Sequence, residues 1–228
     1  MDDLTIIFIT ANKTPEAFAA YHKHILLNAI GEYPLIVVSR ERMDFGAGST
    51  NLLDIEPMKY ENIYKQLLRA AKLAQTEYVA MAEDDVLYSK EHFNFYRPEK
   101  DTFAYNQNRW ALFTWGIPIF NMRQRKSNCS LIAPRLLLIE ALEERFAKWP
   151  NGMPPEHVGE LGRWRVEKGL GVTLRKAVEV YSEVPIIQIN HDAGTEDRQV
   201  RHRKSLGQIK AIEIPYWGKS EDLIKHYR

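Results

Sequence analysis

Hydrophobic residues in the first part of the chain form two kinds of pattern, which alternate along the sequence. Short apolar runs rich in β-branched residues are typical of buried strands, and they alternate with longer segments in which apolar residues recur every three or four positions, as in helices. The predicted strands are residues 5–10, 35–38, 51–55 and 78–82, and the predicted helices are residues 14–31 and 60–74. This alternation favours an α/β fold with a parallel, doubly wound sheet.

The first predicted helix has recognisable ends. Thr14 is placed to cap its N-terminus, and Pro15 falls in the first turn, where the missing N–H is not needed. Gly31 follows the last apolar residue and suits the left-handed conformation that often ends a helix. These signals support a helix as the connection between the first two strands.

The pattern changes after residue 90. Two segments rich in aromatic residues, 105–115 and 117–120, are predicted to form antiparallel strands. The remaining predicted elements are a helix at 135–146 that residues 131–134 lead into, a loop at 149–155, a short helix near 164–168 and a strand at 186–190. Because no linker or low-complexity stretch interrupts the chain, we expect a single domain over residues 1–228, with a β/α half at 1–90 and an aromatic-rich half at 91–228.

Three consecutive acids, Glu83, Asp84 and Asp85, follow the buried strand predicted at residues 78–82. In open α/β sheets, ligands bind at the carboxyl ends of the strands. In an extended or tightly turned backbone, Glu83 and Asp85 point one way and Asp84 points the other way. Two carboxylates on one side suit Mg²⁺ or Mn²⁺, which take oxygen ligands and often share a substrate phosphate. The alternative is a solvated acidic turn.

Length and composition limit the classes of protein to consider. The chain has 228 residues, of which 45% are hydrophobic and 27% charged, as is ordinary for a soluble globular protein. No apolar run approaches the roughly 18 residues of a membrane span, and the acidic start shows no secretory signal, so we expect no membrane span and a cytoplasmic location. The single cysteine, Cys129, excludes an internal disulfide and a cysteine-only zinc site, and we expect it in the core.

The net charge is only +1 and by itself indicates no class of partner. Basic residues nevertheless gather in two segments, 123–126 and 198–210, and the second includes Arg198 and Arg201. Such segments can contact the phosphates of a nucleotide or a nucleic acid, or they can form a solvated basic surface.

Several common nucleotide-binding motifs are missing from the sequence. Gly46 and Gly48 follow no clear strand and open no clear helix, which argues against a dinucleotide-binding fingerprint, and no Walker motif is present. Residues 10–13 contain no glycine. This counts against a nucleotidyltransferase with a glycine-rich phosphate loop after the first strand.

A β/α first half whose fourth strand ends in adjacent acids, an aromatic second half and a late strand followed by a histidine together resemble the GT-A class of nucleotide-sugar glycosyltransferases. Within this class, the chain resembles the small family-2-like transferases of phage and bacterial genomes. The similar segments are residues 82–93, 102–115, 129–146, 159–163 and 215–219.

The resemblance implies a GT-A-like, Rossmannoid α/β fold with a mixed sheet, in which residues 1–90 bind the nucleotide sugar and residues 91–228 bind the acceptor. It implies an enzyme that moves a sugar from a nucleotide-sugar donor, with a UDP-sugar favoured, to a hydroxyl group. The location would be the host cytoplasm if the chain is phage-encoded.

The same resemblance implies roles at the donor site. Glu83 and Asp85 occupy the places of the class's Asp-X-Asp acids, and His191 closes a site for Mn²⁺ or Mg²⁺ from the second half. Because Glu stands in the first Asp position, it stays open whether Glu83 or Asp84 touches the metal. The metal would stabilise charge on the diphosphate leaving group. The implied contacts with the base and ribose of the donor are Thr10, Ala11 and Asn12, and further candidates for donor binding are Asp84, Asp85, Arg198 and Arg201, the two arginines as phosphate ligands.

An inverting transfer, which we expect here, needs a base that takes the proton of the acceptor hydroxyl. Glu160 is the first candidate, because nearby glycines on both sides let its backbone approach a ligand, and Glu156 is the second. Either could instead be a solvated loop acid. Trp110, Trp115 and Trp217 are candidates for stacking on the acceptor, and the alternative for each is core packing.

Two kinds of acceptor are compatible with the sequence. The phage-like resemblance and the basic residues 198–210 favour a 5-hydroxymethylpyrimidine in DNA, whose hydroxyl must be flipped out of the base stack to reach a pocket. The alternative is a glycan, a lipid-linked saccharide or a protein. A different class of function also stays open, namely a non-catalytic module that binds a nucleotide sugar or a nucleic acid.

Overall fold

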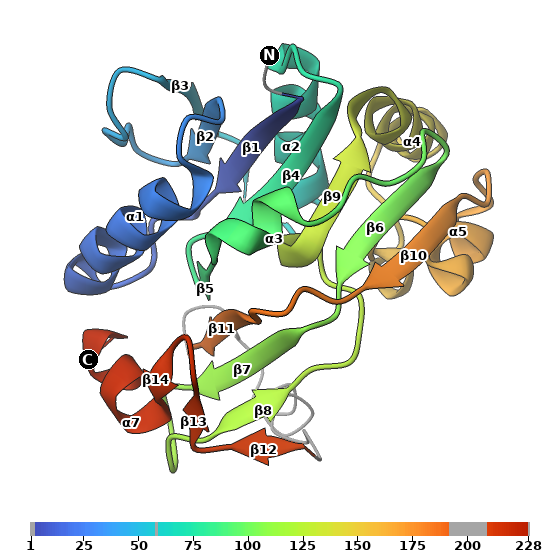
Figure 1. Cartoon of the computed structure of the whole chain (residues 1–228). Coiled ribbons are helices and arrows are strands. Elements are labelled where there is room, and N and C mark those ends of the chain that lie inside the picture. Colours follow the sequence, from blue (N-terminus) through green and yellow to red (C-terminus); the bar gives the residue numbers. More distant parts are fainter. Residues whose placement is uncertain (1–2, 58, 192–208, 228) are drawn as a thin grey trace.

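Seven strands form one large sheet in the computed structural model, which describes residues 3–57, 59–191 and 209–227. They are β1 (Leu4–Ile9), β2 (Leu35–Ser39), β3 (Ser49–Leu53), β4 (Tyr78–Glu83), β6 (Thr102–Asn106), β9 (Leu131–Pro134) and β10 (Lys176–Val180). Their order is β10-β6-β9-β4-β1-β2-β3 (Figure 1). Strands β1 to β4 run parallel, β9 is antiparallel to both neighbours, and β6 is parallel to β10.

A second sheet lies below the first in the view of Figure 1. Its strands are β5 (Val86–Leu87), β7 (Arg109–Phe113), β8 (Phe120–Met122), β11 (Ile186–Asn190) and β12 (Lys210–Ala211), in the order β12-β8-β7-β11-β5. Apolar residues of this sheet pack against Phe18 and against the C-terminal helices α7 (Ser220–Leu223) and η4 (Ile224–Tyr227). A short hairpin, β13 (Glu213–Ile214) and β14 (Gly218–Lys219), leads into these helices.

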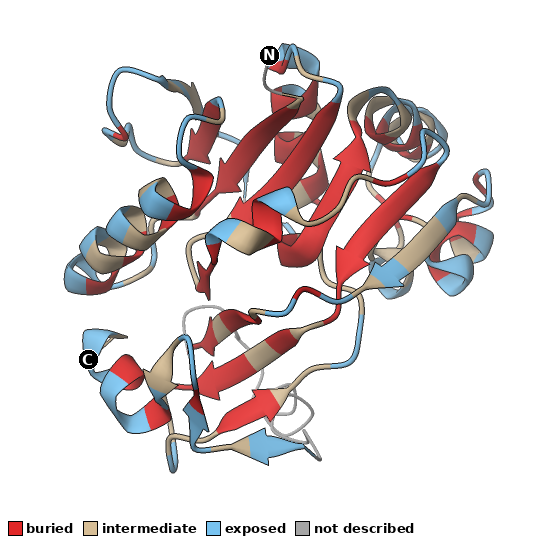
Figure 2. Cartoon of the chain, viewed as in Figure 1, coloured by how far each residue is buried: buried red, intermediate tan, exposed pale blue. Residues whose placement is uncertain are grey.

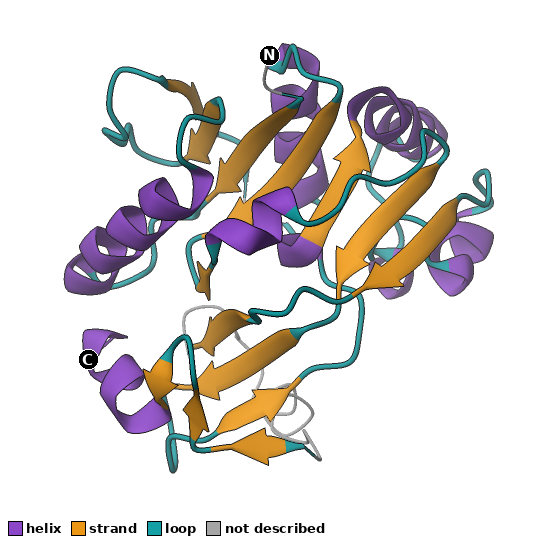
Figure 3. Ribbon diagram, in the orientation of Figure 1, coloured by secondary structure: helices purple, strands orange, loops and turns teal. Residues whose placement is uncertain are grey.

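Helices cover both faces of the larger sheet (Figure 3). They are α1 (Glu16–Ile30), α2 (Asn62–Leu73), α3 (Lys90–Asn94), α4 (Arg135–Lys148) and α5 (Trp164–Leu170). Because side chains alternate along a strand, Ile7 packs with α2, α4 and α5 on one face, while Ile6 and Phe8 pack with α1 and α3 on the other. Figure 2 shows the central strands buried between these two layers.

This arrangement confirms the predicted α/β class with a mixed sheet. Strands β6, β9 and β10 follow residue 90 and complete the sheet that the first half begins, so both halves of the sequence build it. Among the described residues, no helix combines the length and apolar character needed to cross a membrane.

The structure of α1 agrees with the sequence prediction at only one end of the helix. Gly31 ends the helix, as predicted, and its N–H donates to the carbonyl of Leu27 at 3.1 Å, but its φ of 58° and ψ of −119° differ from the left-handed helical conformation. The prediction for Thr14 is wrong, because Pro15 occupies the cap position and no side chain caps the helix. Proline has a fixed φ that suits the entry to a helix, which makes a hydroxyl cap dispensable here.

Two further local predictions differ from the structure. Residues 105–115 divide between β6 in one sheet and β7 in the other, because the Asn106 side chain accepts a hydrogen bond from the N–H of Asn108 at 3.0 Å and turns the chain. Residues 131–134 form the buried strand β9 rather than a lead-in to the helix. The predicted antiparallel pairing after residue 105 is confirmed for β7 and β8.

The acidic turn joins the two sheets directly. Strand β4 ends at Glu83, residues Asp84 and Asp85 form the turn, and β5 begins at Val86 in the second sheet. The N–H of Ile189 in β11 donates to the carbonyl of Asp85 at 2.7 Å. The acids therefore lie where the two sheets meet.

Buried Tyr88 fixes the end of β4. Its hydroxyl accepts a hydrogen bond from the N–H of Glu83 at 3.0 Å and donates one to the carbonyl of Cys129 at 2.9 Å. Cys129 is buried, as expected, and burial raises the pKa of its thiol to about 12. The acidic turn thus rests on buried, hydrogen-bonded groups.

Replacing Tyr88 by Phe removes this hydroxyl and leaves the N–H of Glu83 and the carbonyl of Cys129 without their bridge. We expect the free energy of unfolding to fall by about 1–3 kcal/mol, because buried polar groups that lose their partner carry a desolvation penalty. Urea denaturation measures the change. Tyr60→Phe, at a side chain that is 81% exposed, is the control, and equal stability of the two variants would contradict the expectation.

Candidate functional site

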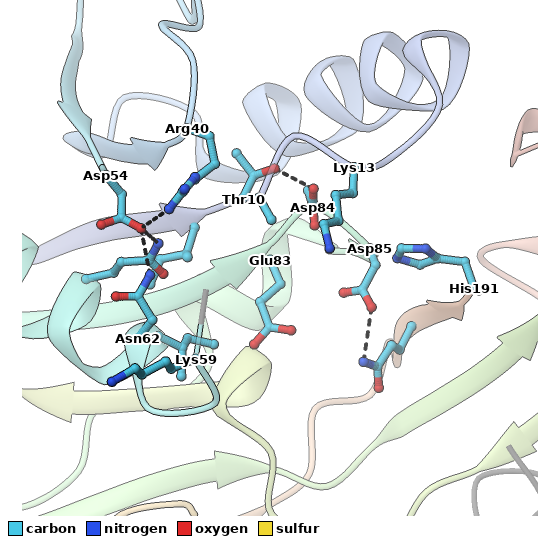
Figure 4. A pocket seen from close by; sticks show the side chains of 15 residues that line it. Thr10, Lys13, Arg40, Asp54, Lys59, Asn62, Glu83, Asp84, Asp85 and His191 are labelled. Atoms are coloured by element: carbon cyan, nitrogen blue, oxygen red, sulfur yellow. Dashed lines mark hydrogen bonds and ion pairs between the residues drawn. The ribbon is translucent and has the colours of Figure 1, made fainter. Parts of the chain in front are cut away.

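A cavity of about 350 Å³ opens at the carboxyl ends of β1, β2 and β4 (Figure 4). Residues that follow neighbouring parallel strands meet there because these strand ends share one edge of the sheet. Its polar lining consists of Thr10, Lys13, Arg40, Asp54, Lys59, Asn62, Gln66, Glu83, Asp84, Asp85, Gln188 and His191. The cavity therefore combines the acids of one turn with basic side chains from other loops.

Glu83 and Asp85 extend to one side of the turn, and Asp84 points the other way, toward Thr10 (Figure 4). The Thr10 hydroxyl donates to the Asp84 carboxylate, and the Gln188 amide donates to Asp85 at 3.3 Å. Burial raises the pKa of Asp84 to about 6, and the charge of Asp85 adds to the rise, while the Thr10 hydrogen bond opposes it. A bound cation would relieve this repulsion.

His191 reaches the acids from the second sheet. Strand β5 pairs antiparallel with β11, so that Gln188 lies opposite Val86, and the chain leaves β11 at His191. The imidazole is buried, lines the cavity and lies beside Asp85 in Figure 4. The structure thus brings Glu83, Asp85 and His191 to one cavity, and their role as metal ligands stays a prediction.

Within the described residues, no three His, Cys, Asp or Glu side chains converge closely enough to enclose a metal ion. A site for Mg²⁺ or Mn²⁺ does not need such an enclosure, because Mg²⁺ is usually held by one or two carboxylates, with waters and substrate phosphates completing the shell. Glu83 and Asp85 supply two carboxylates on one side of the turn. The residues present therefore fit a divalent ion that shares its shell with a phosphate-bearing ligand.

Asn12 holds the loop after β1 against the loop after β2. It has a φ of 55°, a left-handed conformation that asparagine tolerates. Its side-chain oxygen accepts hydrogen bonds from the N–H groups of Arg40 at 2.8 Å and Glu41 at 3.2 Å. Thr10 and Ala11 line the cavity, and Asn12 fixes the shape of their loop. The contact of these residues with a base and ribose stays a prediction.

The sequence analysis missed a fourth carboxylate at the cavity, Asp54. It is buried directly after β3 and accepts hydrogen bonds from Asn62 at 2.7 Å, Gln66 at 2.6 Å and Arg40 at 3.3 Å. Burial acts to raise the pKa of Asp54, but these hydrogen bonds outweigh it and lower the pKa. Arg40 follows β2 as Asp54 follows β3, so the strand-end rule that singled out the acids after β4 could have found both.

The two base candidates are not among the described residues that line this cavity. Glu156 is exposed in the short helix η2 (Pro155–His157). Glu160 is partly buried, and its carboxylate forms an ion pair with Arg163 at 2.7 Å. The role of Glu160 as a base stays a prediction.

A buried ion pair clamps the loop that carries Glu160. Arg145 of α4 and Glu167 of α5 lie 3.8 Å apart, and both side chains are almost inaccessible. Arg145 donates to the carbonyl of Gly159 at 2.8 Å, and Glu167 accepts a hydrogen bond from the N–H of Gly162 at 2.7 Å. The loop backbone is therefore held by charged groups from two helices.

The glycines near Glu160 allow close packing within the protein, and the approach to a ligand that the sequence suggested stays a prediction. A Cβ at Gly159 would lie 2.7 Å from the Val166 side chain, and one at Gly162 would lie 2.6 Å from the Cβ of Ala177. Gly162 also has a φ of 68°, which disfavours other residues.

In the described part of the chain, the acidic cavity is lined by none of the three tryptophans considered for acceptor binding. Trp110 packs with the core of the second sheet, and Trp115 packs against an aromatic neighbour in the loop after β7. Trp217 lines a separate cavity of about 310 Å³ beside α1. Arg198 and Arg201 lie outside the described residues.

Neither a protein-family profile nor a curated protein sequence matches the chain. Among solved structures, a nucleotidyl transferase from Methanothermobacter thermautotroptrophicus aligns at 14% identity and a TM-score of 0.47, over 81% of this chain and 89% of that one. S. aureus TarS, in complex with UDP-GlcNAc, aligns at 12% identity and a TM-score of 0.45, over 83% of this chain and 59% of that one.

A glycosyltransferase involved in the glycosylation of the major capsid of PBCV-1 aligns at 12% identity and a TM-score of 0.42, over 88% of this chain and 98% of that one. Glycosyltransferases thus occur among the similar structures, as the sequence resemblance led us to expect, together with nucleotidyl transferases. At these TM-scores and identities the likeness assigns no activity to the chain.

Replacing Arg145 by Met leaves the Glu167 carboxylate buried without its cation. We expect the free energy of unfolding to fall by about 3–5 kcal/mol, as for other broken buried ion pairs. The double variant Arg145→Met with Glu167→Gln should lose less than the sum of the single losses, because both charges are then absent.

Chemical denaturation of the four proteins measures this coupling. Lys225→Met breaks an exposed ion pair with Asp222 and should leave stability almost unchanged. Strict additivity of the Arg145 and Glu167 effects would show that the two groups do not act together.

Proposed function

We propose that the chain is a metal-dependent glycosyltransferase that moves a sugar from a nucleotide-sugar donor, with a UDP-sugar favoured, to a hydroxyl group. The observation that carries this proposal is the acidic turn at the end of β4, where Glu83 and Asp85 share a cavity with His191 (Figure 4). Acids at such a strand end, with basic side chains from neighbouring strand ends, suit a diphosphate bound through a divalent ion.

Each part of the cavity has its own task in this proposal. Glu83, Asp85 and His191 would hold Mn²⁺ or Mg²⁺, which would supply positive charge for the departing diphosphate. Asp84, hydrogen-bonded to Thr10, would hold the turn in place against the loop after β1. That loop, residues 10–12, would contact the base and ribose.

Basic side chains complete the donor side. Lys13, Arg40 and Lys59 line the same cavity as the acids. Ammonium and guanidinium groups bind phosphate oxygens, so these residues would retain the diphosphate when the glycosidic bond breaks. The chain would act in the cytoplasm, where nucleotide sugars are available.

Glu160 would act as the base of an inverting transfer and take the proton of the acceptor hydroxyl. Its ion pair with Arg163 holds the carboxylate in position, and the Arg145–Glu167 clamp holds its backbone. A loop fixed in this way offers a carboxylate at a defined place, which proton transfer to a base requires.

For the acceptor we favour a 5-hydroxymethylpyrimidine of DNA over a glycan, a lipid-linked saccharide or a protein. Support comes from Arg125, in the segment that follows β8, whose positive charge interacts with the negative charge of Glu160. A nucleic-acid backbone needs such cations. The target base would have to leave the stack to bring its hydroxyl to the cavity.

Asp85→Asn keeps the shape of the side chain and removes its charge. We expect Mn²⁺ and the matching nucleotide sugar together to stabilise the wild type and so raise its melting temperature. At a ligand concentration of a hundred times Kd, the free energy of unfolding should rise by about 2.7 kcal/mol. The variant should lose most of this effect. A thermal-shift panel of UDP-, GDP- and CMP-sugars, with and without Mn²⁺, measures it.

Glu213→Gln, at an exposed acid far along the chain, is the matched control and should respond as the wild type does. Nucleotide binding that needs no metal and survives in Asp85→Asn would count against the proposed transfer and favour a non-catalytic binding module.

Glu160→Gln should lower kcat about 10²- to 10⁴-fold, because a positioned base contributes a factor of this size. Donor binding with Mn²⁺ should persist in this variant. The exposed Glu156→Gln is the control and should keep its activity. The assay follows labelled sugar into DNA that contains 5-hydroxymethylpyrimidines and into plain DNA.

Transfer to hydroxymethylated DNA alone would support the favoured acceptor. Transfer to a glycan, lipid or protein, with neither DNA labelled, would move the assignment to the alternative acceptor. Loss of activity in Glu156→Gln, with Glu160→Gln active, would exchange the roles of the two acids.

A further inference from the structure

Arg109, the first residue of β7, lies opposite Arg123, the residue that directly follows β8. The ladder pairs Trp110 with Met122, so that Arg109 lies opposite Arg123, and the N–H of Arg123 donates to the carbonyl of Arg109 at 2.8 Å. Directly opposite residues project from the same face of a sheet, and like charges there destabilise the strand pair.

Arg109 is almost wholly buried, with 1% of its surface exposed. Its guanidinium donates to the side-chain oxygen of Gln188 at 2.5 Å and to the carbonyl of Arg125 at 3.3 Å, and both acceptors are neutral. Among the described residues its Nε has no hydrogen-bond partner, and no carboxylate forms an ion pair with Arg109 or Arg125. A buried cation without an anionic partner is costly to the fold.

The positive charge of Arg109 also affects nearby arginines. Burial, and then the charges of Arg125 and Arg109, lower the pKa of Arg123 to about 10. Loss of solvent and the charge of Arg109 lower the pKa of Arg125, while Glu160 acts in the opposite direction. The Glu160 carboxylate is already paired with Arg163. We define Arg109, Arg123 and Arg125 as the arginine cluster, in which the charge of Arg109 acts on both of the other two arginines.

We propose that Arg123 and Arg125, supported by buried Arg109, bind a phosphate group of the acceptor substrate. Guanidinium groups match phosphate oxygens with paired hydrogen bonds, and a phosphate beside them would offset the repulsion across β7 and β8. Arg109 is too buried to touch the ligand. It acts through its charge and by holding the carbonyl of Arg125.

The position of the arginine cluster assigns this phosphate to the acceptor and not to the donor, an assignment that rests on the proposed function. Gln188 bridges Arg109 and Asp85, with hydrogen bonds of 2.5 Å and 3.3 Å, so the cluster borders the acidic cavity. Within the described residues, Arg123 and Arg125 do not line that cavity. The charge of Glu160, the candidate base, acts on Arg125 instead.

Inorganic phosphate is the probe for this site. Without divalent metal, at constant ionic strength and with chloride as the reference, phosphate should raise the melting temperature of the wild type more than chloride does. The variant Arg123→Gln with Arg125→Gln should bind phosphate at least about tenfold more weakly, because hydrogen bonds to charged groups are lost. Arg165→Gln, at an exposed arginine of α5, is the matched control and should bind as the wild type does.

A single change keeps the test decisive if the double variant does not fold. Arg125→Gln removes an exposed side chain and leaves the carbonyl that Arg109 contacts in place. It should raise the melting temperature in phosphate-free, low-salt buffer, since repulsion with Arg109 is relieved, and it should weaken phosphate binding. A purely structural arginine would give a lower melting temperature in this buffer.

Donor binding separates this inference from the proposed function. UDP with Mn²⁺ should bind the double arginine variant as tightly as the wild type. If UDP binding falls with phosphate binding, the arginine cluster serves the donor's diphosphate and the assignment is overturned. If phosphate binds the wild type but no sugar nucleotide does, the phosphate site stands and the proposed transfer fails.

Two sources of the phosphate are distinguished by competition. Short single-stranded DNA presents phosphodiesters, and glycerol phosphate presents a phosphomonoester of a polyol. Displacement of inorganic phosphate by DNA alone identifies a nucleic-acid acceptor, and displacement by glycerol phosphate alone identifies a phosphorylated glycan or lipid. Equal phosphate binding by wild type and double variant would refute the site.

Discussion

One hydrogen bond between the second sheet and the acidic turn organises the candidate site, the bond from the N–H of Ile189 to the carbonyl of Asp85 at 2.7 Å. Strand β4 continues through the acidic turn into β5, which has two residues and pairs with β11. This pairing brings Gln188 and His191 to the acids. A slip of one residue would turn the side chains of β11 to the opposite face, so the register between β5 and β11 sets the composition of the cavity.

Charge around this junction is arranged in alternating zones. Carboxylates occupy the turn, Lys13 and Arg40 lie on one side of them, and the arginine cluster lies beyond Gln188 on the other. Burial and a like charge raise the pKa of Asp84 to about 6, and the same two causes lower the pKa of Arg123 to about 10. Each shift disfavours the charged form, and a ligand of opposite charge would reverse it. The zones together suit a cation flanked by two anionic groups.

Local signals were sufficient where burial and strand ends decide the structure. The apolar run at residues 186–190 predicts β11 at its observed bounds, and the strand-end rule finds the acids after β4. Long-range partners decide the rest. Strand β9 is buried between β4 and β6, yet its four residues run straight into α4 and look like the start of that helix. The Arg145–Glu167 clamp and the hydrogen bonds of Asp54 likewise join residues that no local pattern connects.

The buried cysteine has a practical consequence. Alkylating reagents attack the thiolate, which is scarce at neutral pH when burial raises the pKa of Cys129 to about 12. The carbonyl of Cys129 is tied to the same Tyr88 hydroxyl that holds Glu83. Because this is the chain's single cysteine, each molecule can be modified only once. Its modification reports local unfolding of the buried residues that support the acidic turn. The chain therefore carries an internal reporter of local unfolding at the place where its chemistry is assembled.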